Sequence, residues 1–167
     1  MSLQDLREGR PELYEKLVEI ADKRTIPFCY LCYIDAPQGR CVRCGTDDLM
    51  RHLSGVGVEY GYEWVIEHLL SQEVNDISEE DQENLFMDFI DDCYNEETKI
   101  AFLTVNTAWA VKQFDPLAFE MALHEYFDVE AHVEIDGRLY SISAIEIWAE
   151  ESTEKLENNI AVMGVKP

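Results

Sequence analysis

Residues 27–45 read PFCYLCYIDAPQGRCVRCG and contain four of the five cysteines in the chain. Cys29 and Cys32 form one C-x2-C pair, and Cys41 and Cys44 form a second pair after a spacer of eight residues. Each pair is expected to make a tight turn that directs two sulfurs toward one centre. This spacing is typical of a tetrahedral Zn²⁺ site. Four thiolates fill the coordination sphere and leave no position for a catalytic water, so the sequence predicts a structural Zn²⁺.

The surrounding stretch, residues 27–53, resembles a zinc ribbon or a treble-clef knuckle. The sequence Cys41-Val-Arg-Cys44-Gly45 matches the knuckle form, which has glycine after the second ligand, whereas Tyr33 stands where that glycine is common in the first pair. By this resemblance the ligands are Cys29, Cys32, Cys41 and Cys44. Modules of this kind serve protein contacts, nucleic-acid contacts or stability, and the fold alone does not decide between them.

Other uses of these cysteines remain open at this point: two disulfides in a secreted protein, a redox dithiol switch, or an iron–sulfur cluster. The absence of an apolar signal core at the N-terminus disfavours the first, and the spacing disfavours the third. His52 is a candidate for a neighbouring or replacement ligand. The fifth cysteine, Cys93, falls on the apolar face of a predicted helix and is expected to be a buried core residue.

The composition indicates a folded protein of ordinary domain size. The chain has 167 residues, of which 47% are hydrophobic and 11% aromatic, and this excludes a mainly disordered chain. No stretch is long and apolar enough to span a bilayer, and the first residues carry no signal core. We therefore expect a cytoplasmic protein without a membrane partner.

Negative charge is concentrated after residue 54. Residues 1–54 hold 8 basic and 9 acidic residues, whereas residues 55–167 hold 5 basic and 26 acidic ones, and the formal net charge is -22. We divide the chain accordingly into an N-terminal helix and zinc module (1–54), an acidic α+β body (55–157) and a tail (158–167). So acidic a surface disfavours docking on phosphates. A role in solubility alone also remains open.

Hydrophobic periodicity predicts an α+β fold, rich in helix, with a small antiparallel sheet. Helices are expected over residues 11–23, 47–53 after a Thr46 cap, 62–72, 78–94, 107–113, 116–127 and 143–156, with a loop or short strand over 54–61. Ser78 and Asp81 resemble a capping box for the helix whose apolar face is Leu85, Phe86, Phe89, Ile90, Cys93 and Tyr94. Residues 99–105 are expected to form a buried strand.

The clearest strand signal surrounds Asp136-Gly137, which predicts a two-residue hairpin turn. The buried face of that hairpin is expected to consist of Ala131, Val133, Ile135, Tyr140 and Ile142.

Candidate catalytic motifs fail on order or spacing. His132-Val-Glu134 has the H-x-E spacing of a zinc deaminase, but it follows the cysteine pairs instead of preceding one. His124-Glu125 lacks a second histidine four residues on, as a metalloprotease helix requires, and no phosphate-binding glycine motif is present. We therefore expect that the protein is not an enzyme.

Acidic residues at helical spacing suggest a binding surface. They form two groups: Glu59, Glu63 and Glu67, and then Glu80, Asp81, Asp88, Asp91 and Asp92. A row of carboxylates can occupy a groove built for a nucleic-acid backbone, and long-range attraction steers it there. We expect an acidic protein that binds a basic surface of a nucleic-acid-handling protein, as an inhibitor or nucleic-acid mimic of phage or plasmid type, while the acidic body does not bind DNA.

Five residues of the N-terminal module support an alternative function. Arg40, Arg43 and Arg51, together with Tyr30 and Tyr33, could form a small basic and aromatic patch around the zinc. Such a patch suits single-stranded nucleic acid. In this alternative the protein is a zinc-ribbon regulator that contacts nucleic acid or the transcription machinery through residues 1–54.

Overall fold

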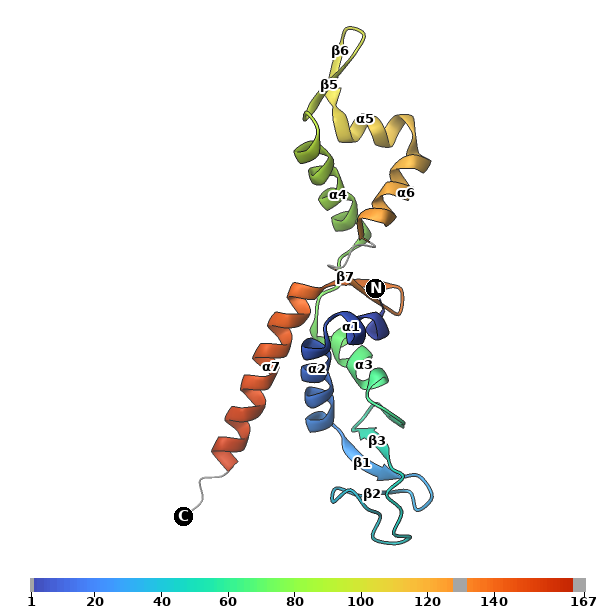
Figure 1. Cartoon of the computed structure of the whole chain (residues 1–167), viewed down its shortest axis with the longest axis vertical. Helices are drawn as coiled ribbons and strands as arrows, with labels where there is room; N and C mark the ends of the chain where they lie inside the picture. The colour runs from blue at the N-terminus through green and yellow to red at the C-terminus, as the bar shows by residue number, and fades with distance from the viewer. Residues whose placement is uncertain (1, 128–131, 164–167) are drawn as a thin grey trace.

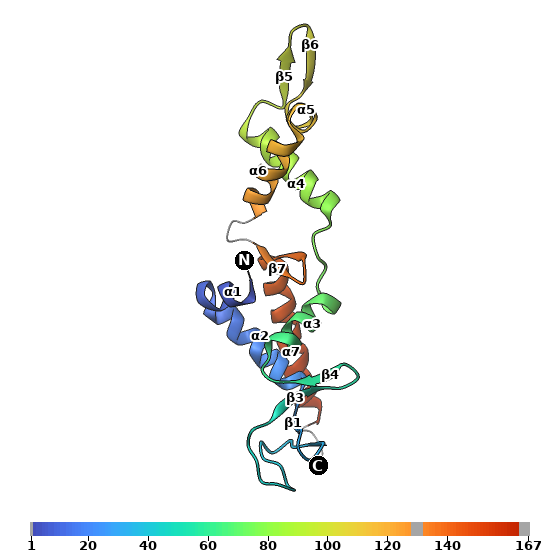
Figure 2. The same cartoon turned by 90° about the vertical axis from the view of Figure 1, so that its right-hand side faces the viewer.

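A computed structural model describes residues 2–127 and 132–163 and shows an α+β protein rich in helix (Figure 1). Its helices are α1 Leu3–Gly9, α2 Pro11–Arg24, α3 Glu63–Glu73, α4 Glu79–Cys93, α5 Thr107–Phe114, α6 Pro116–Phe127 and α7 Ile142–Met163. Its strands are β1 Ile26–Cys29, β2 Ile34–Asp35, β3 Met50–Leu53, β4 Gly57–Glu59, β5 Glu97–Ile100, β6 Leu103–Asn106, β7 His132–Ile135 and β8 Arg138–Ser141. The molecule is elongated: α4, α5, α6 and the β5–β6 hairpin lie at one end, and β1–β4 lie at the other (Figures 1 and 2).

The middle of the molecule holds the main core. Side chains from α1, α2, α3, the β7–β8 hairpin and α7 pack together there, and they include Leu6, Leu17, Ile66, Tyr140 and Ile145. Burial of a large aliphatic side chain contributes about 1.5–3 kcal/mol, so this cluster supplies most of the driving force for folding. The core contains residues from both sides of position 54. The division of the chain at that position is a difference in charge between the two segments. A domain boundary there stays a prediction.

The β7–β8 hairpin confirms the predicted turn and buried face. Val133 pairs with Tyr140, and the turn residues Asp136 and Gly137 have φ of 50° and 73°, as a type I′ turn requires. Val133, Ile135, Tyr140 and Ile142 are all buried. Ala131, predicted to belong to the same face, lies outside the described residues.

Cations of the N-terminal segment meet acids of the later segment on the surface of this core. Arg10 Nη1 lies 2.9 Å from Glu146 Oε1, and Arg24 Nη1 lies 3.2 Å from Glu73 Oε1. Trp148 Nε1 donates to the second oxygen of Glu73 over 3.1 Å. These contacts connect α2 with α3 and α7. Each exposed pair contributes little free energy by itself. The main effect of these pairs is to place cations of the N-terminal segment beside acids of α3 and α7.

The N-terminal sheet has the antiparallel order β2-β1-β3-β4. Pro27 on β1 is opposite Arg51 on β3, and His52 on β3 is opposite Val58 on β4. The helix predicted over residues 47–53 is therefore wrong. Residues 50–53 extend because β1 and β4 offer them backbone partners on both sides, and pairing of this kind depends on tertiary context, not on local propensity.

A smaller core holds α4, α5 and α6 together. It consists of Phe86, Ile90, Ala108 and Phe119. The predicted cap of α4 is confirmed, because Ser78 Oγ accepts from Asp81 N at 3.1 Å. The backbone of the preceding linker also reaches the central core, since Ile77 N donates to Leu139 O over 2.7 Å.

Two predictions for this smaller lobe, residues 79–127, are wrong. Residues 99–105 do not form a buried strand: they belong to the exposed β5–β6 hairpin, in which Ala101 turns the chain with a φ of 57° and Phe102 points to solvent. Cys93 is exposed instead of buried, because among the described residues the packing of α5 and α6 on α4 covers Phe86 and Ile90 but does not extend to Cys93. The small core of this lobe leaves part of the predicted apolar face of α4 uncovered.

The last helix, α7, continues to Met163, beyond residue 158, where the tail was predicted to begin. Within the described residues, no helix combines the length and the apolarity that a membrane crossing requires.

Candidate functional site

The four predicted metal ligands converge at the end of the molecule that holds β1 and β2. The Sγ atoms of Cys29, Cys32, Cys41 and Cys44 all lie within 4.8 Å of one another. The sulfurs of Cys29 and Cys44 are 3.6 Å apart, and all the cysteines are free. A tetrahedral site with Zn–S bonds of about 2.3 Å has S···S edges of about 3.8 Å. The donor set and its spacing therefore fit one metal ion with four thiolate ligands.

Two similar turns of backbone present the sulfurs. Cys29 ends β1, and the first turn leads through Cys32 back into β2; in the second turn, Gly45 N donates to Cys41 O over 2.9 Å. The residue after each pair has a positive φ, 54° at Tyr33 and 74° at Gly45. Tyr33 thus adopts the backbone conformation that glycine supplies in the second turn, at a cost in strain. Its ring packs edge-on against Phe28, with centroids 5.2 Å apart.

The electrostatics of the cluster call for a cation. Backbone N–H groups of Cys44 and Arg43 lower the pKa of Cys41 to about 6, despite its burial. The neighbouring thiol of Cys44, followed by burial, raises the pKa of Cys32 to about 12, and burial raises the pKa of Cys29. The thiol of Cys41 therefore ionises most readily, whereas burial and hydrogen bonds with neighbouring thiols hold the proton on Cys29 and Cys32. Ionising all four would add repulsion between thiolates that lie within 4.8 Å of one another. A divalent cation offsets that repulsion and allows all four to ionise.

His52 does not join the sulfur cluster. Its Nδ1 lies 2.8 Å from Asp35 Oδ1, and its ring meets Phe28 edge-on, so it connects β3 with β2 across the sheet. The metal-sized group contains only the four cysteines among the described residues. His52 therefore stabilises the N-terminal sheet through its contacts with Asp35 and Phe28.

The predicted basic and aromatic patch is only partly assembled. Arg51 forms an ion pair with Asp22, and its guanidinium carbon lies 4.5 Å from the centre of the Tyr62 ring, so this arginine is engaged beside α2. Arg40 lies 3.7 Å from Asp47. Tyr30 and Tyr33 are exposed near the cysteines.

The structure divides the predicted acidic groups into structural and exposed members. Asp91 accepts from Asn106 Nδ2 at 2.8 Å, so it holds the start of α5, and Asp81 pairs with the Ser78 cap. Glu80, Asp88 and Asp92 are exposed on α4. In the other group, burial raises the pKa of Glu67, and Asp136, Glu63 and Glu59 raise it further. Glu59, Glu63 and Glu67 therefore share one surface.

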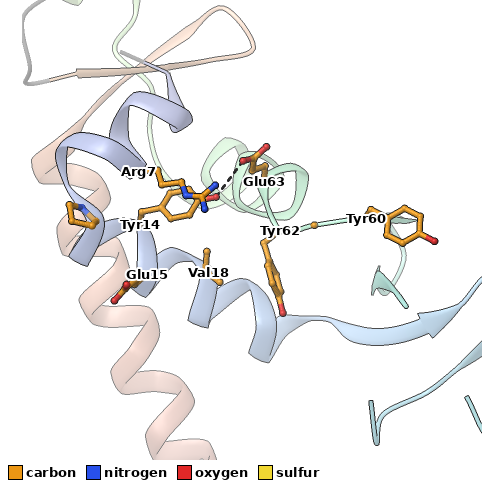
Figure 3. A pocket seen from close by; sticks show the side chains of 9 residues that line it. Arg7, Tyr14, Glu15, Val18, Tyr60, Tyr62 and Glu63 are labelled. Carbon is orange, nitrogen blue, oxygen red and sulfur yellow. Dashed lines mark hydrogen bonds between the residues drawn. The ribbon is translucent and has the colours of Figure 1, made fainter. Parts of the chain in front are cut away.

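A hollow of about 670 Å³ lies between α2 and α3 (Figure 3). Tyr14 OH donates to Glu63 Oε1 over 3.4 Å, and the Arg7 guanidinium lies 5.7 Å from the centre of the Tyr14 ring. Burial, and then the charge of Glu63, raises the pKa of Tyr14. Arg7, Tyr14 and Glu63 therefore contact one another, and these contacts connect α1, α2 and α3 at the hollow.

The residues of the rejected catalytic motifs lie elsewhere. His132 and Glu134 are on β7, in the middle of the molecule, whereas the cysteine cluster is at the β1–β2 end (Figure 1). Burial lowers the pKa of His132, which favours its neutral form. His124 is on α6.

One surface feature was not predicted from the sequence, an apolar groove in the lobe of α4, α5 and α6. Phe86, Phe89, Val111, Phe119 and Tyr126 are among the residues that line it. Two of them, Phe86 and Phe89, lie at helical spacing in the sequence, and this spacing predicted a buried face of the helix.

Comparison with known proteins does not assign this chain to a family. No protein-family model, no curated protein and no solved structure matches it. The class that the structure supports is an α+β protein with a four-cysteine centre suited to a metal ion.

Replacing one sulfur should remove the metal. Cys41 is only 2% exposed, and a Cys41→Ser variant offers a poorer ligand at the centre of the cluster. We expect about one divalent metal ion per chain in the native protein and a marked loss in the variant, with lower stability of residues 26–59. Elemental analysis and hydrogen exchange measure the two effects. Cys93→Ser is the matched control, and equal metal content in all three proteins would contradict the assignment.

The strained turn at Tyr33 gives a second prediction. Tyr33→Gly and Tyr33→Ala both lose the contact with Phe28, but only glycine relaxes the positive φ. The glycine variant should be the more stable of the two by roughly 1 kcal/mol, measured by denaturant unfolding of the metal-loaded protein. Gly45→Ala should lose a similar amount through backbone strain alone, since a Cβ there meets nothing within 4 Å. An alanine variant at least as stable as the glycine variant would argue against strain at Tyr33.

The raised pKa of Glu67 predicts a pH dependence of stability. The folded state holds the proton more tightly than the unfolded state, so stability falls as pH rises from about 4.5 through the higher folded pKa. Glu67→Gln should therefore raise the melting temperature at pH 7, with a smaller difference from wild type near pH 4. The control is Glu97→Gln on the exposed β5 strand. A Glu67→Gln variant that is less stable than wild type at pH 7 would show that the Glu67 carboxylate is favourably placed.

Proposed function

We propose that this protein is a non-enzymatic, zinc-binding acidic protein that binds a basic surface of a nucleic-acid-handling protein, in the manner of a phage- or plasmid-type inhibitor. The observation that carries the proposal is the charge of one lobe. Residues 79–127 hold 12 acidic side chains and two lysines. One of those lysines, Lys112, is engaged by Glu83.

The acids of this lobe differ from those of the central core in their surroundings. Near the core, cations of the N-terminal segment pair with Glu146, Glu150 and Glu73. Residues 79–127 receive no such cation in the described part of the chain, apart from Lys112 within the lobe itself. A partner that supplies lysines and arginines would reduce the repulsion between these carboxylates, and the uncompensated field would steer its approach.

The role proposed for the metal is structural Zn²⁺. Four sulfur donors complete a tetrahedral shell and leave no place for substrate or water. Few side chains of residues 26–59 are buried, among them Phe28, Cys29, Ala36 and Cys41. So small an apolar cluster gives little stability, and a bound metal would hold the two cysteine turns together.

The alternative, nucleic-acid binding through the N-terminal module, has less support. Arg51 and Arg40 are engaged by Asp22 and Asp47, which leaves Arg43 as the remaining arginine of the predicted patch. The strongly acidic remainder of the chain opposes the approach of phosphates.

Reversing charge on α4 tests the proposal. Glu80, Asp88 and Asp92 are exposed, so replacing all three with Lys should change the fold little and slow association with a basic partner, most strongly at low salt. Asp91 is left intact because it holds α5. The matched control reverses Glu8, Glu12 and Glu15, which alters the net charge equally in the N-terminal segment.

The measurement is the association rate, against ionic strength, with a partner captured from nuclease-treated lysate. Equal association rates for the wild type, the α4 variant and the control at every salt concentration would contradict the proposal and would show that the charge serves solubility alone. Tight binding of the wild type to duplex or single-stranded DNA would instead favour the alternative.

A further inference from the structure

The groove of the α4–α6 lobe is apolar and uncovered. It has a volume of about 550 Å³, and its lining includes Phe86, Phe89, Tyr94, Val111, Phe119 and Tyr126. The Phe89 and Tyr126 rings lie 4.8 Å apart, so aromatic side chains of α4 and α6 form a continuous wall. Phe89 is 42% exposed, Val111 41% and Tyr94 68%. Contiguous apolar surface of this kind marks an interaction site.

We infer that this groove binds an amphipathic helix, rich in lysine or arginine, that belongs to a partner protein. The inference rests on the proposed function, the binding of a basic protein surface, and names the part of the molecule that does it. The apolar face of the helix would lie against Phe89, Val111 and Tyr126, and its cationic flanks would lie toward the surrounding acids.

Charge selects the occupant. Asp92 is one helical turn from Phe89, Glu125 lines the groove, and the whole lobe carries 12 acids against two lysines. An apolar segment flanked by lysine or arginine therefore finds both a contact surface and an attractive field. A second copy of the same lobe would bring like charges together, which costs free energy and disfavours a dimer through this face.

The walls of the groove select a helix over an extended segment. The lining side chains come from α4, the Tyr94 that follows it, α5 and α6, and the backbone groups of these helices are already hydrogen-bonded within them. No strand contributes to the described lining, so an extended peptide would find no sheet edge to pair with. A helix satisfies its own backbone and needs only an apolar face, with anchors at i, i+3, i+4 and i+7.

Two synthetic peptides test the inference on the full-length, metal-loaded protein. The first has about five helical turns, with leucines along one face and lysines elsewhere. The second has the same composition, with its leucines distributed around the helix. We expect the full-length protein to bind the first peptide at least about tenfold more tightly by calorimetry, because only that peptide buries its leucines against the groove.

Variants locate the binding surface. Phe89→Ser and Tyr94→Ser should each abolish most of this preference, whereas Leu117→Ser, which makes a similar change on α6 outside the groove lining, should keep it. Tyr94 is the more exposed position, so its variant tests the groove even where the Phe89 variant loses stability by circular dichroism.

The outcomes separate this inference from the proposed function. If both peptides bind equally and salt weakens both, the inference that the groove binds a helix is overturned, whereas the proposal of a partner bound through charge is retained. If the first peptide binds more tightly and salt does not change its affinity, binding in the groove is supported and the charge-based proposal is overturned. A dimer of the wild type that Phe89→Ser dissociates in sedimentation would show that a second copy occupies the groove, and would overturn the inference.

Discussion

Repulsion between carboxylates constrains every part of this structure. The chain carries 35 acidic and 13 basic residues, so most acids have no cation to pair with. The central core tolerates its acids because Arg10, Lys16 and Arg24, at the start of α2 and along it, lie beside acids of α3 and α7. Such exposed pairs are worth little individually, and the apolar core must supply the free energy that keeps α1, α2, α3, β7–β8 and α7 together. The charge pattern then determines which surfaces of the folded chain attract and which repel.

The two ends of the molecule carry different kinds of repulsion, between thiolates at one end and between carboxylates at the other. At the β1–β4 end, four sulfurs crowd together, and their mutual repulsion on ionisation is offset when one divalent cation binds. At the α4–α6 end, acids surround a small aromatic core, and the described residues of that lobe offer Lys112 and Lys99 as cations. The first end is completed, in our proposal, by a metal ion held within the chain. The second end is completed, again in our proposal, by cations that another protein brings.

Local signals in the sequence predicted local structure well. The Asp136-Gly137 turn, the Ser78 cap and the cysteine spacing each depend on residues a few positions apart, and the structure contains all three features. The failures involve partners distant in sequence. Residues 50–53 are extended because β1 pairs with them, and Asp91 serves α5 through Asn106, which no helical spacing could indicate. His52 likewise meets Asp35 across a sheet whose order the sequence does not reveal.

The misjudged face of α4 shows what periodicity can and cannot establish. Apolar residues at helical spacing predicted one buried face, and Phe86 and Ile90 are indeed buried. Phe89, Cys93 and Tyr94 follow the same pattern, yet the structure leaves them exposed. Periodicity indicates that a face avoids water; it does not indicate whether the covering surface belongs to the same chain. On a helix whose other faces are so acidic, the apolar side chains that remain uncovered after folding are, in our proposal, the surface that a partner covers.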